Sequence, residues 1–222
     1  MKSRKITNAN KIKMGRGAGE GTDYKPWIKN RETSPMNTTY NVVNWKTGRM
    51  MELPNKPMHD AFLFLNWQSD VIDIRELYPV DVDALQPFIQ QASHELAAYG
   101  ETLTDGILRH VICTDFLVTL RDNTYAAYMV AKNHSAMSNA KVEQVYLLKR
   151  YWNNREVPFH LLYTDSFNKT FIQNLCICMP FYAEGSYTDS IGRFKHLVAT
   201  KQITIDMTKG LITSDYINSE VN

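Results

Sequence analysis

Two apolar runs near the middle of the chain give the clearest pattern of hydrophobic and polar positions. Residues 111–118 are mostly β-branched or apolar, and Asp115 interrupts them. A second apolar run, residues 125–132, follows a turn-forming segment and ends on Lys132. Apolar stretches of this length, separated by a turn, predict two buried strands that form a hairpin.

The acid within the first run and the lysine at the end of the second indicate a candidate site. A carboxylate inside a buried strand needs a partner or a metal, because an isolated buried charge is costly. The predicted hairpin can bring Asp115 and Lys132 together. Two interpretations are open from these residues alone: an ordinary ion pair at the end of a sheet, or a metal-dependent nuclease site beside a scissile phosphate.

The rest of the pattern alternates helices with strands. A helix between two strands implies a crossover, so this alternation predicts an α/β fold with a mixed sheet flanked by helices. In chain order we expect a helix from Asn55, a strand over 70–76 that stops at Tyr78-Pro79, a helix over 81–99, the hairpin, a helix from Ser138 and a strand over 158–163.

The first 22 residues form a basic, glycine-containing arm. Its cations all precede the first acid, Glu20, and its apolar residues are too sparse for a well-packed helix. We therefore expect the arm to be mobile until an anion orders it, and the phosphate backbone of DNA is the natural candidate. A solvated leader without a partner is the alternative. The candidate DNA-binding residues are Lys2, Arg4, Lys5, Lys11, Lys13 and Arg16.

The end of the chain predicts a small separate module. Two helices are expected near 168–178 and 189–200, followed by a hairpin that joins 202–206 to 211–213. Helices followed by a short hairpin suggest a cut-down winged helix. Its apolar faces are larger than so short a segment can bury alone, which favours a partner-docking role. The expected organisation is an arm at 1–22, a main domain at 23–166 and this module at 167–222.

Composition narrows the class of protein only slightly. The chain has 222 residues, 44% of them hydrophobic and 22% charged, with a net charge of +2. This is ordinary for a globular protein with a substantial core. The three cysteines have no zinc-ligand spacing and an odd count. Without a long apolar run or a signal peptide, the chain is expected to be cytoplasmic and not associated with a membrane.

Five motifs, in the same order and at similar spacing, resemble the TnsA family of endonuclease subunits from heteromeric cut-and-paste transposases. Together they extend across roughly residues 14–165. The motifs are Gly15-Arg16-Gly17 through Tyr24-Lys25-Pro26-Trp27, Lys46-Thr47-Gly48-Arg49, residues 71–76 before Tyr78-Pro79, residues 114–118, and Arg150-Tyr151-Trp152 before Pro158.

This resemblance implies a restriction-endonuclease fold of the PD-(D/E)xK type. It also implies cleavage of the non-transferred strand at transposon ends. The implied partners are double-stranded DNA, a TnsB-like transposase and a TnsC-like ATPase. The implied nuclease site combines a helix glutamate, a strand aspartate and a Gln-x-Lys motif around two Mg²⁺ ions, which stabilise the attacking and leaving oxygens.

This sequence retains two of the four side chains of the implied nuclease site. The resemblance places Asp115 at the aspartate position and Lys132 at the lysine position, as the candidate metal ligand and catalytic residues. The glutamate position falls on Met58 and the glutamine position on Val130. Since Mg²⁺ requires hard oxygen donors, neither residue replaces the family's ligand. We expect a Mg²⁺ site that is weak until DNA is bound.

Neighbouring residues offer few substitutes. His59 and Asp60 point away from the Met58 position on a helix, whereas Glu52 in the preceding segment can supply a ligand only by folding back. Glu143 is either a supporting group of the site or part of a solvated helix face. Three functions are open: a TnsA-like endonuclease with impaired cleavage, an inactive pseudonuclease that binds DNA and docks partners, and a phage DNA-processing nuclease of the same fold.

Overall fold

The computed structural model describes residues 6–32, 38–104, 111–183, 185, 187 and 189–221, with the backbone alone described at 218–221. Lys2, Arg4 and Lys5 of the expected arm lie outside these ranges. Within them, no helix has both the length and the apolar character needed to cross a membrane.

The centre of the fold is a four-stranded mixed sheet of β3 (Val71–Val80), β4 (Ile112–Leu120), β5 (Tyr125–Ala131) and β6 (Phe159–Tyr163). The strands lie in this order; β3, β4 and β5 are antiparallel neighbours, whereas β5 and β6 are parallel. A parallel pair needs a crossover, which α4 (Asn139–Asn153) provides. The α/β class is confirmed, and the arrangement is consistent with a restriction-endonuclease-like fold.

Strand β3 is longer than the sequence suggested. It continues through Tyr78 and Pro79 to Val80, pairing Pro79 with Cys113 of β4. Proline removes a backbone donor, so it is tolerated in a strand mainly at an edge. Because β3 is the first strand of the sheet, the missing N–H of Pro79 interrupts no pairing with a further strand.

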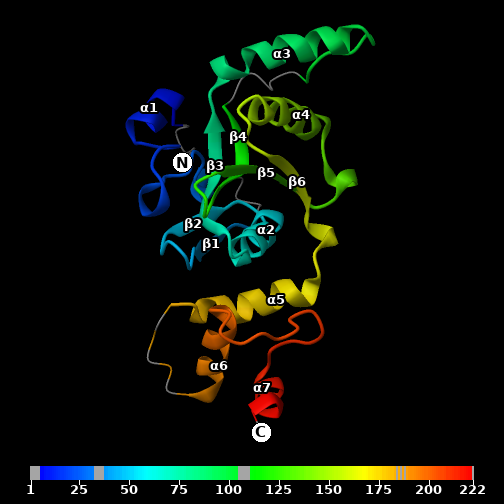
Figure 1. Ribbon diagram of the computed structural model, residues 1–222. Coiled ribbons are helices and arrows are strands. Elements are labelled where there is room, and N and C mark those ends of the chain that lie inside the picture. The colour runs from blue at the N-terminus through cyan, green and yellow to red at the C-terminus, as the bar shows by residue number, and fades with distance from the viewer. Residues whose placement is uncertain are drawn as a thin grey trace.

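Two helices cover one face of the sheet. Figure 1 shows α4 next to the sheet and α3 (Val82–Ala97) on its outer side. Their apolar side chains form a core with this face of the sheet, which includes Val80, Leu85, Ile89, Leu117, Met129, Leu147 and Trp152. The amphipathic helix expected over 81–99 is therefore present, and it packs on α4.

The opposite face is covered by α2 (Lys56–Trp67) and by a hairpin of β1 (Tyr40–Val43) and β2 (Met50–Leu53). Asn55 caps α2, because its side-chain oxygen accepts from the Met58 N–H at 2.9 Å. The apolar face of α2 is buried in a second core that contains Met51, Leu53, Met58, Phe62, Leu65, Phe116, Val118 and Val130.

The C-terminal residues extend that second core. They form α5 (Lys169–Cys178), α6 (Ser190–Ala199) and α7 (Ser214–Val221). Figure 1 shows α5 lying between α2 and the last two helices. Buried side chains of this part, including Ile172, Leu175, Phe194, Val198, Met207, Ile212 and Ile217, belong to the same cluster as the core of α2. The module therefore shares a continuous apolar core with the nuclease-like domain.

The winged-helix hairpin expected at 202–206 and 211–213 is wrong. These residues contain no strand; they form a loop with turns around Asp206–Gly210. Asn174 of α5 holds the loop, since its amide donates to the carbonyls of Met207 and Gly210 and its oxygen accepts from the Ile212 N–H. Alternation of apolar residues here serves core packing without strand pairing.

The N-terminal segment covers the outer edge of β3. The Trp27 N–H donates to the Leu77 carbonyl, and the Tyr24 hydroxyl donates to the Glu76 carbonyl. Gly17, with φ +75°, lies so close to Pro79 that an added Cβ would be 2.2 Å from the proline ring. The segment contains α1 (Asn8–Lys13) and the 3₁₀ turns Gly21–Asp23 and Asn30–Glu32; further such turns are His134–Ala136, Thr164–Ser166 and Met179–Phe181.

Candidate functional site

Asp115 lies near the middle of β4 and is only 7% exposed. Its Oδ2 accepts a hydrogen bond from the Val130 N–H at 2.7 Å and another from Lys141 Nζ at 2.8 Å. The carboxylate thus joins β4, β5 and the first turn of α4. Burial of this charge is compensated by an ammonium group and a backbone donor, as a buried carboxylate requires.

The sheet changes the direction of its side chains at Asp115. Ile74 of β3 and Phe116 and Val118 of β4 belong to the core beneath α2, whereas Val80 of β3 and Ile112 of β4 belong to the core beneath α4, and all of these residues are even-numbered. The change falls after Glu76 and Phe116, which pair with each other. Leu77, between Glu76 and Tyr78, has φ +50°, a strained value for a residue other than glycine. Asp115 occupies the corresponding position between Phe116 and Thr114. The side-chain alternation of both strands therefore reverses at these two residues.

Lys132 does not contact Asp115. It is exposed just after β5 and lines a pocket of about 440 Å³ between the start of α2 and the start of α5. Asp60 and Asp165 also line this pocket. Asp165 accepts from the Asn133 side chain at 2.7 Å, and Asp60 accepts from Lys56. The expected pairing of Asp115 with Lys132 is thus replaced by pairing with Lys141.

The two remaining family positions are apolar and buried. Met58 is 3% exposed and Val130 is 5% exposed, and both belong to the core beneath the sheet. Neither side chain offers an oxygen, and Mg²⁺ needs several oxygen ligands in near-octahedral geometry. Among the described residues, no three His, Cys, Asp or Glu side chains gather as a metal site would require. The donor set around Asp115 does not fit a Mg²⁺ ion.

The substitutes considered from the sequence have other partners. Glu52 accepts from the Asn30 N–H at 2.7 Å and lies 3.6 Å from Lys29 Nζ. Glu143 accepts from the N–H and the hydroxyl of Thr104, so it fixes the segment after α3. Glu143 is therefore neither an unpartnered solvated residue nor a contact of Asp115.

The basic arm is ordered by the domain itself over the described residues. Arg16 is 4% exposed and donates to Glu32 and to the Trp27 carbonyl. Lys11 lies 3.3 Å from Glu32 and over the ring of Trp27. Lys13 remains exposed. Since Arg16 and Lys11 already have internal partners, their sequence pattern has a structural explanation that requires no DNA.

Several motif residues form a buried polar network beside the sheet. Arg49 of the Lys46–Arg49 turn binds both carboxylate oxygens of Glu76, at 2.8 and 2.6 Å, and Glu76 is fully buried. The guanidinium also lies over the Tyr24 ring. Bidentate arginine–carboxylate pairs combine charge with fixed geometry. Many residues that carry the family resemblance are thus explained by folding.

Sequence reasoning missed Lys141. The available signal was a cation in the first turn of a predicted helix that has no acid there, a placement that the helix dipole disfavours. A carboxylate partner offsets that cost. The electrostatic effect of the pair extends to Cys113, whose pKa rises to about 12 through burial and the nearby Asp115 charge, while Lys141 opposes the rise.

Comparison with known proteins supports the resemblance. No protein-family model matches the chain. The transposon Tn7 transposition protein TnsA of Escherichia coli is 29% identical over 170 residues, which are 75% of this chain. The match covers 60% of the length of that relative. With the mixed sheet described above, this similarity supports the TnsA-like family that the sequence motifs indicated.

Proposed function

We propose that this chain is a TnsA-like subunit of a heteromeric DNA transposition machine, and that it cleaves DNA weakly or not at all. The similarity to a transposition protein supports the class. The single observation that carries the loss of cleavage is the contact between Asp115 and Lys141. The Lys141 ammonium group binds the Asp115 carboxylate, to which the family resemblance assigns metal binding.

The chemistry of the neighbouring residues supports the same proposal. A hydrolytic nuclease of this class needs oxygen ligands that hold Mg²⁺ next to the phosphate. Met58 and Val130 are apolar and lie in the core, and Lys132 lines a pocket to which Asp115 does not contribute. Lys132 can still stabilise negative charge on a phosphate, but it cannot supply the attacking oxygen.

The partners follow from the class. We propose double-stranded DNA at transposon ends, a TnsB-like transposase and a TnsC-like ATPase. The proposed DNA contacts of the arm are made by Lys13, which is exposed, and by Lys2, Arg4 and Lys5, which form a basic cluster in the sequence and lie outside the described residues. Arg16 and Lys11 contribute to the stability of the segment that presents them.

A plasmid-nicking assay tests the cleavage half of the proposal. Purified protein with Mg²⁺ or Mn²⁺ should nick supercoiled DNA no faster than the Asp115→Ala variant does. Strong Mg²⁺-dependent nicking that Asp115→Ala abolishes would refute an impaired site. In that case Asp60 in the Lys132 pocket is the first residue to substitute.

DNA and partner binding test the other half. Removing residues 1–5 should weaken duplex binding and flatten the plot of log affinity against log salt by about 0.9 for each phosphate that the arm no longer neutralises. Lys149→Gln, an exposed position on α4, is the matched control. A transposase encoded beside this chain should co-purify with it. Absence of both DNA and transposase binding would overturn the assignment to the TnsA class.

A further inference from the structure

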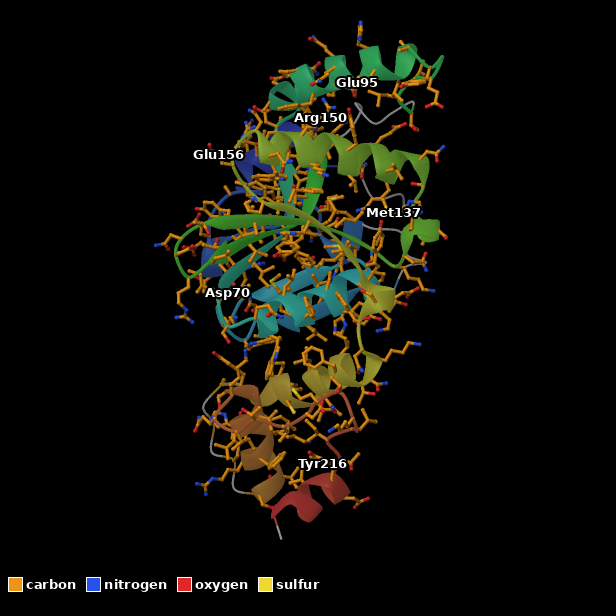
Figure 2. The ribbon with its side chains drawn as sticks, turned by 45° about the vertical axis from the view of Figure 1, so that its right-hand side comes forward. Asp70, Glu95, Met137, Arg150, Glu156 and Tyr216 are labelled. Carbon is orange, nitrogen blue, oxygen red and sulfur yellow. The ribbon has the colours of Figure 1, made fainter. Side chains whose placement is uncertain are left out.

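A basic cleft lies between the end of α2 and the C-terminal helices. We define it by Lys46, Arg121 and Lys201, which line a cavity of about 400 Å³. The three cations come from the β1–β2 turn, the β4–β5 turn and the end of α6, so folding alone brings them together. Trp45, Trp67 and Tyr182 are also in the lining. Figure 2 labels Asp70, which lies in the turn between α2 and β3.

All three cations bind the chain between α2 and β3. Lys46 Nζ donates to the Gln68 and Val71 carbonyls, both at 2.5 Å. Lys201 Nζ donates to the Trp67 carbonyl and the Ser69 hydroxyl, and Arg121 donates to the Ser69 carbonyl. Cations at the C-terminal end of a helix are favourable, because its carbonyls carry partial negative charge. These contacts give the cleft a structural role.

The positive charge exceeds what that role requires. The end of a helix carries roughly half a negative charge, and Asp70 adds one carboxylate. Three cations therefore leave an excess of about one to two positive charges in the cleft. The pKa of Lys46 reflects first its burial and then these neighbouring charges. Burial and the nearby Lys201 lower it to about 8, with Arg121 acting in the same direction and Asp70 opposing them.

Hydrogen-bond donors also remain available. A lysine ammonium has three N–H donors and an arginine guanidinium has five. Lys46 and Lys201 each donate twice within the fold, and Arg121 donates once from its side chain. A multidentate oxygen anion can accept the remaining N–H groups and neutralise the excess charge. A phosphate group has this combination of charge and acceptors.

We propose that the basic cleft binds a phosphate group. The group can belong to a DNA backbone or to a free phosphate compound, and the experiments below separate these two sources. The DNA arm of this proposal deepens the proposed function and rests on it, whereas the free-phosphate arm does not.

The first experiment measures duplex binding against salt concentration for Arg121→Gln, Lys201→Gln and the double variant. Both side chains are exposed, and each substitution removes one charge. Each should reduce the salt slope by about 0.9, and the double variant by about twice that. Lys209→Gln, whose side chain is 83% exposed on the neighbouring loop, is the matched control and should leave the slope unchanged.

The second experiment uses the unaltered protein, so it does not depend on a variant that folds. The pKa of Lys46 is about 8, so a large share of its amine is unprotonated at pH 8 and should react with an acetylating reagent. Acetylation is followed by mass spectrometry with inorganic phosphate, pyrophosphate or duplex DNA present. Protection of Lys46 and Lys201, without protection of Lys209, is the expected result.

The outcomes separate the proposals. Protection by pyrophosphate, with duplex bound equally by the double variant, would support a free phosphate ligand in the cleft. If duplex binds but neither slope nor acetylation responds at these residues, the cleft is only a clamp on the end of α2 and the inference is wrong. Failure of the protein to bind any duplex contradicts the proposed function, while pyrophosphate protection would still uphold the cleft.

Discussion

Lys141 Nζ lies 2.8 Å from Asp115 Oδ2, and the same oxygen accepts from the Val130 N–H. Lys141 belongs to the first turn of α4, where a cation is disfavoured by the helix dipole. The contact therefore fixes the start of the crossover helix onto the two central strands. It gives Asp115 a structural function that is independent of any metal.

This ion pair should be measurable as an energetic coupling. Lys141→Met and Asp115→Asn should each lower the free energy of unfolding by about 1–3 kcal/mol, because each leaves a partly buried polar partner unpaired. The double variant should be less destabilised than the sum of the two. Urea unfolding measures all three, with Lys149→Met on the exposed face of α4 as the control. Additive effects would mean that the contact contributes nothing to stability.

Restoration of cleavage should require three changes. Met58→Glu with Val130→Gln returns oxygen donors to the family positions, but Lys141 still holds the carboxylate of Asp115. Adding Lys141→Met should produce Mg²⁺-dependent nicking, which Asp115→Ala should then remove. The nicking rates of the double and triple variants give the test. Equal rates for these two would show that Lys141 does not block the site.

The C-terminal helices should unfold together with the sheet. Leu175 of α5 is fully buried in the core shared with α2. Leu175→Ala should therefore cost about 2–5 kcal/mol in one cooperative unfolding transition. Leu211→Ala, at a 43% exposed position, should change stability by less than about 0.5 kcal/mol. Two separate transitions would instead indicate an independent module. Partner docking is best tested by surface substitutions, because deletion of 167–222 would expose this core.

The Arg49–Glu76 pair should be among the most sensitive positions. Arg49→Met leaves the fully buried Glu76 carboxylate without its bidentate partner. Loss of one member of a buried ion pair typically costs about 3–5 kcal/mol. Thermal unfolding of Arg49→Met, compared with Arg49→Lys, tests this expectation. A melting temperature close to that of the unaltered protein would show that the network relaxes without cost.

The cysteines should differ in reactivity toward iodoacetamide at pH 8. Burial, with the nearby Asp115, raises the pKa of Cys113 to about 12, and burial raises that of Cys178 to about 11. A raised pKa keeps these thiols protonated and unreactive as pH rises through 8. Cys176 is exposed and should be modified first, as peptide mass spectrometry can show. Equal rates at all three cysteines in the folded protein would contradict this.

Much of the fold could be predicted from local patterns. The helix after Asn55 and the two central strands follow from capping and apolar periodicity, and all three elements are present. The pairing of Asp115 was not predictable, because it depends on a reversal of side-chain alternation at Leu77. Leucine gives no signal for a positive φ. The hairpin was expected to bring Lys132 to Asp115, but its register pairs Phe116 with Tyr128 and leaves Lys132 beyond the end of β5.

The prediction of a C-terminal hairpin was wrong for a different reason. Ile203 and Ile205 alternate with polar residues, which is typical of a strand. Both side chains instead pack against the core beneath α2, while Asn174 satisfies nearby backbone groups. The alternation of apolar and polar residues indicates which side chains are buried, but it does not indicate which backbone groups are hydrogen-bonded in a sheet.

The covering of β3 by the N-terminal segment has a consequence for the behaviour of the protein in solution. An uncovered outer strand presents unpaired backbone groups that can recruit a strand from another molecule. Here the Trp27 N–H binds the Leu77 carbonyl, and Gly17 fits closely against Pro79. The residues of the first motif therefore cover the edge of β3 and hinder its pairing with a strand of another copy. We expect a shortened protein that begins after Trp27 to self-associate through the exposed edge of β3.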